Sequence, residues 1–114
     1  MIPIQEIDVY SNKGIKISAH LVVPSVGNNL SAAEVLVYDP VCNILYSDYQ
    51  KLGQYEDPQT AFKSIIDFSK KYIEQSGGSV IRINNPNNTE FVDAQLQQKL
   101  VSALIPGLTV EVNG

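Results

Sequence analysis

The segment richest in side chains that can hold a ligand is Asn84–Glu90, which reads Asn-Asn-Pro-Asn-Asn-Thr-Glu. It follows an apolar stretch, Val80–Ile83, and it precedes a segment with helical spacing. Free backbone N–H groups and the helix dipole attract anions at the start of a helix. Asn84, Asn85 and Asn87 are therefore candidates for binding a phosphate or a nucleotide.

The same turn has a structural interpretation, which we favour. Asn87 is followed three residues later by Glu90, and this spacing has the form of a capping box. In that motif the two side chains satisfy backbone N–H groups at the start of a helix. A well-capped corner would leave ligand binding to other parts of the chain.

Glu90 and Asp93 are the carboxylates closest to this turn on its C-terminal side. At positions i and i+3 they share one face of a helix, where they can hold a hard cation such as Mg²⁺ or act as an acid–base pair. Carboxylates in a first helical turn are also favoured by the helix dipole alone. We favour the dipole interpretation and expect no metal and no cofactor.

Tyrosines are dense between Tyr38 and Tyr55, where Tyr46 and Tyr49 also lie. Exposed tyrosines often anchor protein interfaces, and tyrosines in strands also fill the packing surface of a sheet. Packing is the favoured interpretation for the group as a whole. If tyrosines carry binding, we expect the Tyr46–Tyr55 edge to do so, together with the N-terminal hairpin.

The chain has one histidine and one cysteine. His20 falls on the polar side of an alternating segment, beside Lys16 and Ser18, which indicates a surface residue. Cys42 lies in an expected turn, with no histidine or cationic cluster nearby to activate its thiol. A single cysteine also excludes an intrachain disulfide and a thiolate metal site.

The hydrophobic pattern predicts the elements that position these residues. Apolar and polar residues alternate on both sides of a Ser-Asn-Lys-Gly turn, which predicts a β-hairpin of Ile4–Tyr10 and Ile15–Val23. Glu34–Tyr38 is apolar enough to be buried on both faces of a sheet. Ile44–Tyr49 is expected to return beside it, and Lys51–Glu56 reads as a polar loop.

Two helices are expected in the second half of the chain, Pro58–Gln75 and Asn87–Leu104. Asp57 as N-cap and Pro58 at the first helical position begin the first helix. Asn87 or Asn88 is expected to cap the second. The core residues expected from the helical spacing are Phe62, Ile65, Ile66, Leu96 and Leu100.

The predicted order is β-β-β-β-α-β-α-β, an α+β or α/β fold with a mixed sheet and two main helices packed on it. The strands Val80–Ile83 and Leu108–Val112 flank the second helix, so a right-handed crossover makes them parallel neighbours. We expect residues 1–114 to form a single domain. Residues 1–31, the N-terminal hairpin and its connection, are expected to extend the sheet or to serve as a binding arm.

From Glu34 onward this order resembles the core of the cytidine-deaminase fold. The C-terminal sequence resembles the bacterial polymorphic-toxin deaminases, the group that contains the double-stranded-DNA deaminase toxin. The segment that carries this resemblance is VIRINNPNNTEFVDAQLQQKLVSALIPGLTVEV. In that family a strand ends in an Asn-Asn-Pro-like turn, and a leucine and a proline precede the last strand. Here those features match Ile83–Pro86, Leu104–Gly107 and Leu108–Val110. The resemblance implies a deaminase-like core over residues 32–114.

The residues that the resemblance assigns to zinc are missing. A zinc deaminase uses one histidine and two cysteines as ligands and a glutamate that moves protons. Asp57–Thr60 stands where the family has its His-x-Glu pair, and Glu90 and Asp93 stand where it has its two cysteines. We therefore expect a pseudoenzyme that binds no zinc and deaminates neither cytidine nor adenine.

The charge balance bears on the partner. The 114 residues include 12 Asp and Glu against 8 Lys and Arg, a formal net charge of −4. Nucleic-acid affinity comes largely from clustered Lys and Arg, so this balance argues against a nucleic-acid partner and fits a basic protein. No apolar run is long enough to span a membrane, and Met1–Ile4 begins no secretory signal. We expect a cytoplasmic bacterial protein, or a domain of a longer one.

Two functions remain open at this point. The favoured one is a non-catalytic deaminase-like domain that binds another protein, such as a basic toxin or effector, in toxin–immunity competition between bacteria. The alternative is a toxin domain that hydrolyses phosphodiesters or nucleotides with a metal other than zinc on Glu90 and Asp93. The candidate binding residues are Tyr46, Tyr49, Tyr55, Asn84, Asn85, Asn87, Glu90 and Asp93.

Overall fold

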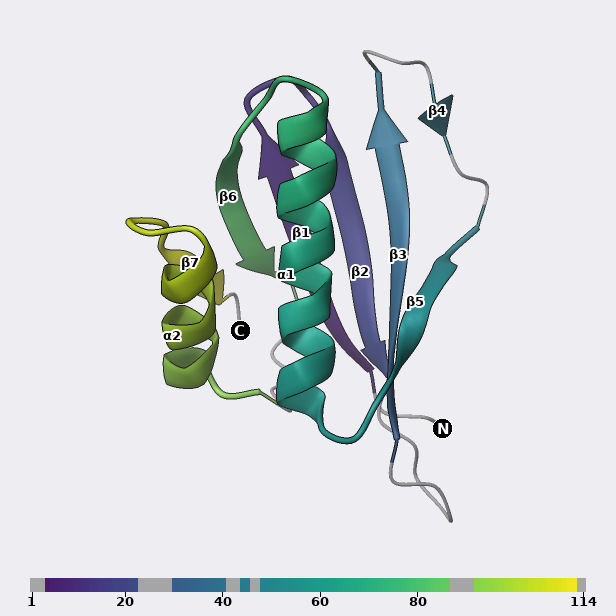
Figure 1. Cartoon of the computed structure of the whole chain (residues 1–114), viewed down its shortest axis with the longest axis vertical. Coiled ribbons are helices and arrows are strands. Elements are labelled where there is room, and N and C mark those ends of the chain that lie inside the picture. The colour runs from purple at the N-terminus through teal and green to yellow at the C-terminus, as the bar shows by residue number, and fades with distance from the viewer. Residues whose placement is uncertain (1–3, 23–29, 41–43, 46–47, 87–91, 113–114) are drawn as a thin grey trace.

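The computed structural model describes residues 4–22, 30–40, 44–45, 48–86 and 92–112. The elements within these residues are β1 (Ile4–Ser11), β2 (Lys16–Val22), β3 (Ser31–Asp39), β4 (Ile44–Leu45), β5 (Gln50–Tyr55), α1 (Pro58–Gln75), β6 (Val80–Asn85), α2 (Ala94–Leu104) and β7 (Val110–Val112). The strands form one mixed sheet, and the helices pack on it (Figure 1). The expected mixed α+β class is confirmed.

The sheet of the described residues has the strand order β4-β3-β2-β1-β6-β7, with β5 paired to β3 as well. Neighbouring strands are antiparallel except for β6 and β7, which are parallel. This pairing confirms the parallel arrangement predicted for the strands on either side of the second helix. It follows from the crossover through α2, which returns the chain to the same edge of the sheet.

The N-terminal hairpin lies at the centre of the sheet. β1 pairs with β2 on one side and with β6 on the other, and β2 pairs in turn with β3. The expectation that the hairpin extends the sheet or serves as an arm is therefore wrong. Its alternating apolar residues explain the position, because Ile7, Val9, Ile17 and Leu21 are all buried in the core.

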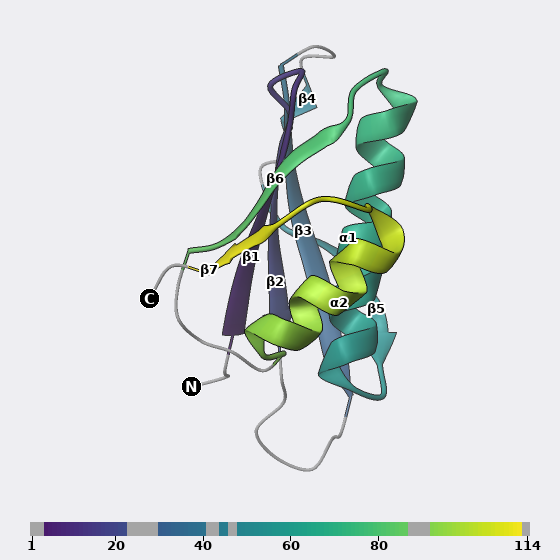
Figure 2. The same ribbon diagram turned by 90° about the vertical axis from the view of Figure 1, so that its left-hand side faces the viewer.

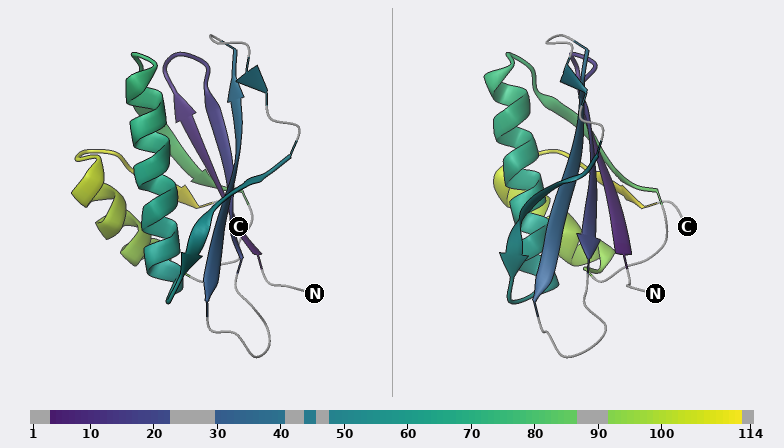
Figure 3. Two further views of the ribbon diagram at one scale, coloured as in Figure 1. Left: turned by 45° about the vertical axis from the view of Figure 1, so that its right-hand side comes forward. Right: turned by 90° about the vertical axis from the view of Figure 1, so that its right-hand side faces the viewer.

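β3 is buried on one face only. Ala33, Val35 and Val37 are buried, whereas Glu34 and Leu36 between them are partly exposed. The prediction of burial on both faces is wrong because both helices lie on the same side of the sheet. Figures 2 and 3 show this arrangement, in which the described residues place no helix over the other face.

The strands after β3 also differ from the prediction. Within the described residues, β4 comprises only Ile44–Leu45. Gln50–Tyr55 forms β5 beside β3, although most of this segment was expected to be a loop. An edge strand needs apolar side chains only where it meets the core, and here Leu52 and Tyr55 supply them. The other residues of β5 are polar, so the hydrophobic pattern does not predict a strand there.

α1 begins as predicted and packs on β1, β2, β3, β5 and β6. Oδ1 of Asp57 accepts a hydrogen bond from the N–H of Thr60 at 2.7 Å, and Pro58 occupies the first turn. This N-cap satisfies a backbone donor that the helix itself leaves unpaired. The expected core residues of this helix are all fully buried: Phe62, Ile65 and Ile66.

α2 packs on α1 and β7. It begins at Ala94 and not at Asn87, so the predicted start of this helix is wrong. Leu96 and Leu100 are partly buried against the core as expected, while Gln97 and Val101 are fully buried. No helix among the described residues is both long and apolar enough to cross a membrane.

Candidate functional site

Asn85, from the polar turn, belongs to a closed ring of hydrogen bonds. Its Nδ2 donates to Oε1 of Gln97 at 2.7 Å, and its Oδ1 accepts from Nε2 of Gln5 at 2.9 Å. Nε2 of Gln97 donates to the carbonyl oxygen of Val92 at 2.7 Å. The N–H of Val92 donates to Oε1 of Gln5 at 3.2 Å, which closes the ring.

This ring joins β1, β6, α2 and the residue Val92 before α2 inside the protein. Gln5, Asn85 and Gln97 are each at most 1% exposed. Buried amides are costly unless both ends are paired, and in this ring each of the three side-chain amides both donates and accepts. The structure thus gives Asn85 a role in the fold. Its neighbour Asn84 lies on the other face of β6, opposite Asp8 of β1.

Asp93 is the N-cap of α2. Its Oδ1 accepts a hydrogen bond from the N–H of Leu96 at 2.9 Å. The cap predicted at Asn87 or Asn88 is therefore at Asp93, and a carboxylate also suits the positive end of the helix dipole. Asn87 and Glu90 lie outside the residues that the structure describes.

A metal centre finds no support in the described ranges. Over those residues, no group of three or more His, Cys, Asp or Glu side chains is arranged to hold a metal ion. The Asp93 carboxylate is engaged in capping, as described above. The proposed metal pair with Glu90 therefore stays a prediction.

The tyrosines predicted to form one edge lie on different faces of the sheet. Tyr55 pairs with Ser31 of β3 and packs against the core on the helix side. Tyr49 lies on the side without helices, where its ring stacks on that of His20 with centroids 3.9 Å apart. Tyr46 and Cys42 are outside the described residues.

The face of the sheet opposite the helices, called the open face below, gathers charged and aromatic side chains from β1, β2, β3, β5, β6 and β7. In β1, β2 and β3 they alternate with buried residues, and the pairing register aligns the side chains of neighbouring strands into rows that run across the sheet. The residues of the open face are Glu6, Asp8, Tyr10, Lys16, Ser18, His20, Glu34, Leu36, Tyr38, Tyr49, Lys51, Arg82, Asn84 and Glu111. Asn84 is only 5% exposed.

The first row, called the cationic row, is Arg82–Tyr10–Lys16–Tyr38, on four adjacent strands. Cζ of Arg82 lies 5.2 Å and Nζ of Lys16 lies 5.6 Å from the centre of the Tyr10 ring. Both distances are within the range of cation–π attraction. Tyr38 ends the row with 48% of its surface exposed.

A second row, called the acidic row, is Glu6–His20–Glu34–Lys51. His20 therefore has a glutamate directly opposite it on each neighbouring strand. Tyr49 covers the histidine ring, which explains why His20, expected on the surface, is only partly exposed. The two glutamates give this end of the open face its negative charge.

The pKa of Tyr49 responds to this charge. Burial raises it above its ordinary value, and the negative charges of Glu6, Asp8 and Glu34 raise it further. Each of these effects disfavours the phenolate, either by removing water or by repelling a second negative charge. The electrostatic potential at the Tyr49 hydroxyl is therefore negative.

Between these rows lies the row Glu111–Asn84–Asp8–Ser18–Leu36. Its carboxylates partly neutralise the cationic row. Glu111 accepts a hydrogen bond from Nε of Arg82, which raises the pKa of that guanidinium, and Asp8 lies 4.0 Å from Nζ of Lys16. Even so, the side chains of Lys16 and Arg82 remain 44% and 46% exposed.

A comparison of the chain with protein-family models, with curated proteins and with solved structures gives no match. Within the described residues, the open face is where charged and aromatic side chains from the most strands meet.

Sequence reasoning missed the open face as a unit. Tyr10, Lys16 and Arg82 come from three strands, and they meet only because β1 is central and pairs in a particular register with β2 and β6. The alternation of apolar and polar residues in β2 predicts that Lys16 and His20 lie on the outward side of the sheet. This was the only part of the open face that the sequence indicated. The register between strands far apart in sequence was not readable from the pattern.

Proposed function

We propose that this domain is non-catalytic and binds another protein through the open face. One observation carries the proposal: both helices cover the opposite face, so the aromatic and charged side chains of the open face share one surface that the described residues leave without a helix. Tyr10, Tyr38 and Tyr49 lie on that surface among charged groups. Tyrosine and arginine are the residue types that most often anchor protein interfaces.

The charges favour a protein over a nucleic acid as the partner. Arg82 and Lys16 already lie beside Glu111 and Asp8, so the cationic row offers little net charge to a phosphate backbone. The acidic row and the net charge of −4 suit a basic patch on a partner. We propose such a basic protein as the partner.

The wider context is proposed from the resemblance described above. A deaminase-like domain without zinc ligands suits an inhibitor or immunity-type protein in competition between bacteria. In that setting the partner is a toxin encoded next to this gene. The alternative, metal-dependent hydrolysis by Glu90 and Asp93, draws no support from the described residues, because the Asp93 carboxylate caps α2.

The test is a titration of this domain with the purified product of the neighbouring gene, measured by calorimetry. Tyr38→Ala removes an exposed aromatic side chain from the open face without touching the core. We expect it to weaken binding by about 1–2 kcal/mol, as for a central interface tyrosine. The matched control is Lys71→Ala on α1, whose side chain is 68% exposed and lies on the helix side.

Lys71→Ala should bind like the wild-type chain. The proposal fails if binding is lost in the α1 variant and kept in Tyr38→Ala. It fails equally if the purified domain hydrolyses nucleotides or nucleic acid in the presence of Mg²⁺.

A further inference from the structure

The charges of the open face are ordered along the strands. The cationic row and the acidic row are separated by four residues of β2, from Lys16 to His20. Strand geometry makes this separation about 14 Å, at about 3.4 Å per residue. One end of the open face therefore carries the cations Lys16 and Arg82 with two tyrosines, and the other end carries the glutamates Glu6 and Glu34 with Lys51.

This order makes the open face complementary to a second copy of itself. In such a pair, the open faces of two copies lie against each other. A two-fold axis that lies between the two sheets, perpendicular to their strands, makes the strands of one copy run opposite to those of the other. In a two-fold interface each residue contact occurs twice, once in each direction. The cationic row of each copy then faces the acidic row of the other, and Lys16 meets the pair Glu6 and Glu34.

We propose that two copies of this chain associate face to face through the open face, with Lys16 of each copy beside Glu34 of the other. Lys16 is 44% exposed despite its contact with Asp8, so its ammonium remains available for a second carboxylate. The Tyr49 ring, which stands on His20 in the acidic row, then faces the tyrosines of the cationic row.

The size of the face predicts a weak dimer. Four strands at about 4.8 Å spacing and three rows give an area on the order of 400 Å² per copy. A stable interface usually buries about 800 Å² on each partner. Association of this kind populates dimers only at high protein concentration, and it covers the same surface that we propose for the partner. Self-association would therefore compete with partner binding.

The test uses charge reversal in the full chain, followed by sedimentation equilibrium from micromolar to millimolar concentration. Lys16→Glu and Glu34→Lys each turn two attractive contacts of the dimer into repulsive ones. We expect each to raise the dissociation constant of the dimer by at least about tenfold. The chain that carries both changes restores the contact between positions 16 and 34 with reversed sign, while Glu6 then faces a like charge. We therefore expect its dissociation constant to fall clearly below that of either single variant.

The double variant isolates contacts between copies. Lys16 and Glu34 lie about 14 Å apart within one chain, by the strand geometry above. This exceeds the Debye length of about 8 Å at physiological ionic strength, so their coupling inside one chain is small. Stronger dimerisation of the double variant than of the single variants would therefore come from a contact between the two copies.

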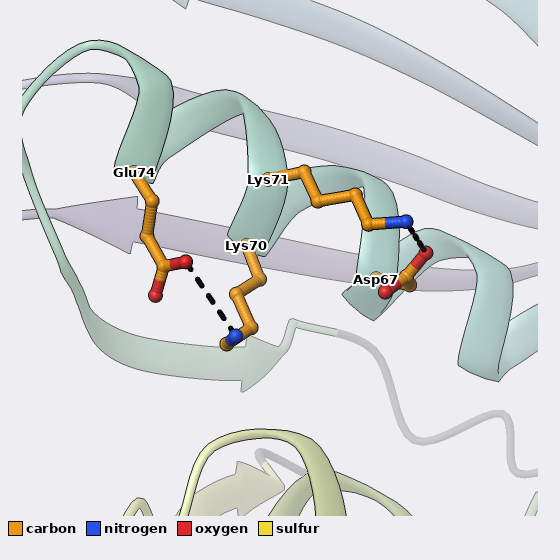
Figure 4. A network of polar contacts seen from close by, with 4 residues as sticks. All are labelled: Asp67, Lys70, Lys71 and Glu74. Atoms are coloured by element: carbon orange, nitrogen blue, oxygen red, sulfur yellow. Dashed lines mark ion pairs between the residues drawn. The ribbon is translucent and has the colours of Figure 1, made fainter.

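Two control variants carry the same changes in charge on α1. Figure 4 shows the pairs Lys71–Asp67 and Lys70–Glu74 on this helix, at 3.0 Å and 3.5 Å. Lys71→Glu matches Lys16→Glu, and Asp67→Lys matches Glu34→Lys. Both controls should leave the dissociation constant of the dimer unchanged. If a charge reversal on the sheet prevents folding, Lys16→Gln and Glu34→Gln replace it, with weaker dimers expected from each.

A wild-type chain that stays monomeric up to millimolar concentration overturns the inference. So does a dimer that the single reversals do not weaken, or that the double variant does not restore. These results leave the proposed function untouched, because partner binding is measured separately on dilute, monomeric protein.

Discussion

Asn85 shows at the scale of one residue how a polar turn can serve the fold. Its amide bonds to Gln5 and Gln97, and neither end faces solvent. The sequence has four asparagines in a segment that suggests a ligand site. The glutamines that complete the ring lie on other elements, and Gln5 is 80 residues away in the chain, so the sequence pattern alone could not reveal the ring.

Asn85→Ala should destabilise the protein strongly. The substitution removes the hydrogen bonds that Asn85 makes with Nε2 of Gln5 and Oε1 of Gln97, and the loss of a partner costs a buried polar group about 1–3 kcal/mol. We expect the free energy of unfolding to fall by about 2–4 kcal/mol in urea titrations. Gln95→Ala, which removes an exposed amide from α2, is the matched control and should change stability by less than about 0.5 kcal/mol. Equal stability of the two variants would refute the role of the ring.

Tyr49→Phe tests whether the pKa of Tyr49 is raised in the folded protein. The pKa of Tyr49 is raised in the folded protein by burial and by Glu6, Asp8 and Glu34. Its contribution to stability is thus complete below the ordinary tyrosine pKa of about 10 and is lost as the pH rises through the folded pKa. Between pH of about 8 and about 11, the wild type should lose more stability than Tyr49→Phe. Parallel losses of the two proteins, measured by urea unfolding at several pH values, would contradict the raised pKa.

At the scale of helices and strands, the sequence predicted the elements that are determined by residues close together in the chain. Asp57 and Pro58 mark the start of α1 by capping chemistry, and alternation marks β1 and β2. The predicted start of α2 is wrong because several residues before it can cap a helix, and the sequence pattern does not single out Asp93, which is the N-cap in the structure. β5 was missed because an edge strand keeps a polar face.

The cap of α2 gives a prediction at this scale. Asp93→Ala should lower the free energy of unfolding by about 1 kcal/mol, the usual worth of an N-cap, whereas Asp93→Ser keeps a capping oxygen and should lose less. Urea unfolding of both variants measures the difference. If Asp93 instead held a metal, millimolar Mg²⁺ would raise the melting temperature of the wild type and of neither variant. We expect no such rise.

The topology of the whole molecule determines which surface is available. A hairpin at the centre of the sheet and two helices on one side leave a broad face of four central strands opposite the helices. The composition predicts an acidic protein, but it does not predict that both helices lie on one side of the sheet. The order of strands depends on pairings between residues far apart in sequence, and local patterns carry little information about them.

The most direct test of the open face is to map the backbone amide signals of the labelled domain by NMR while its purified partner is added. Binding through the open face predicts the largest shifts in β1, β2 and β3, around Tyr10, Lys16 and Glu34, with α1 around Lys71 nearly unchanged. Shifts concentrated on α1 and α2, with the signals of the three central strands unmoved, would contradict the account.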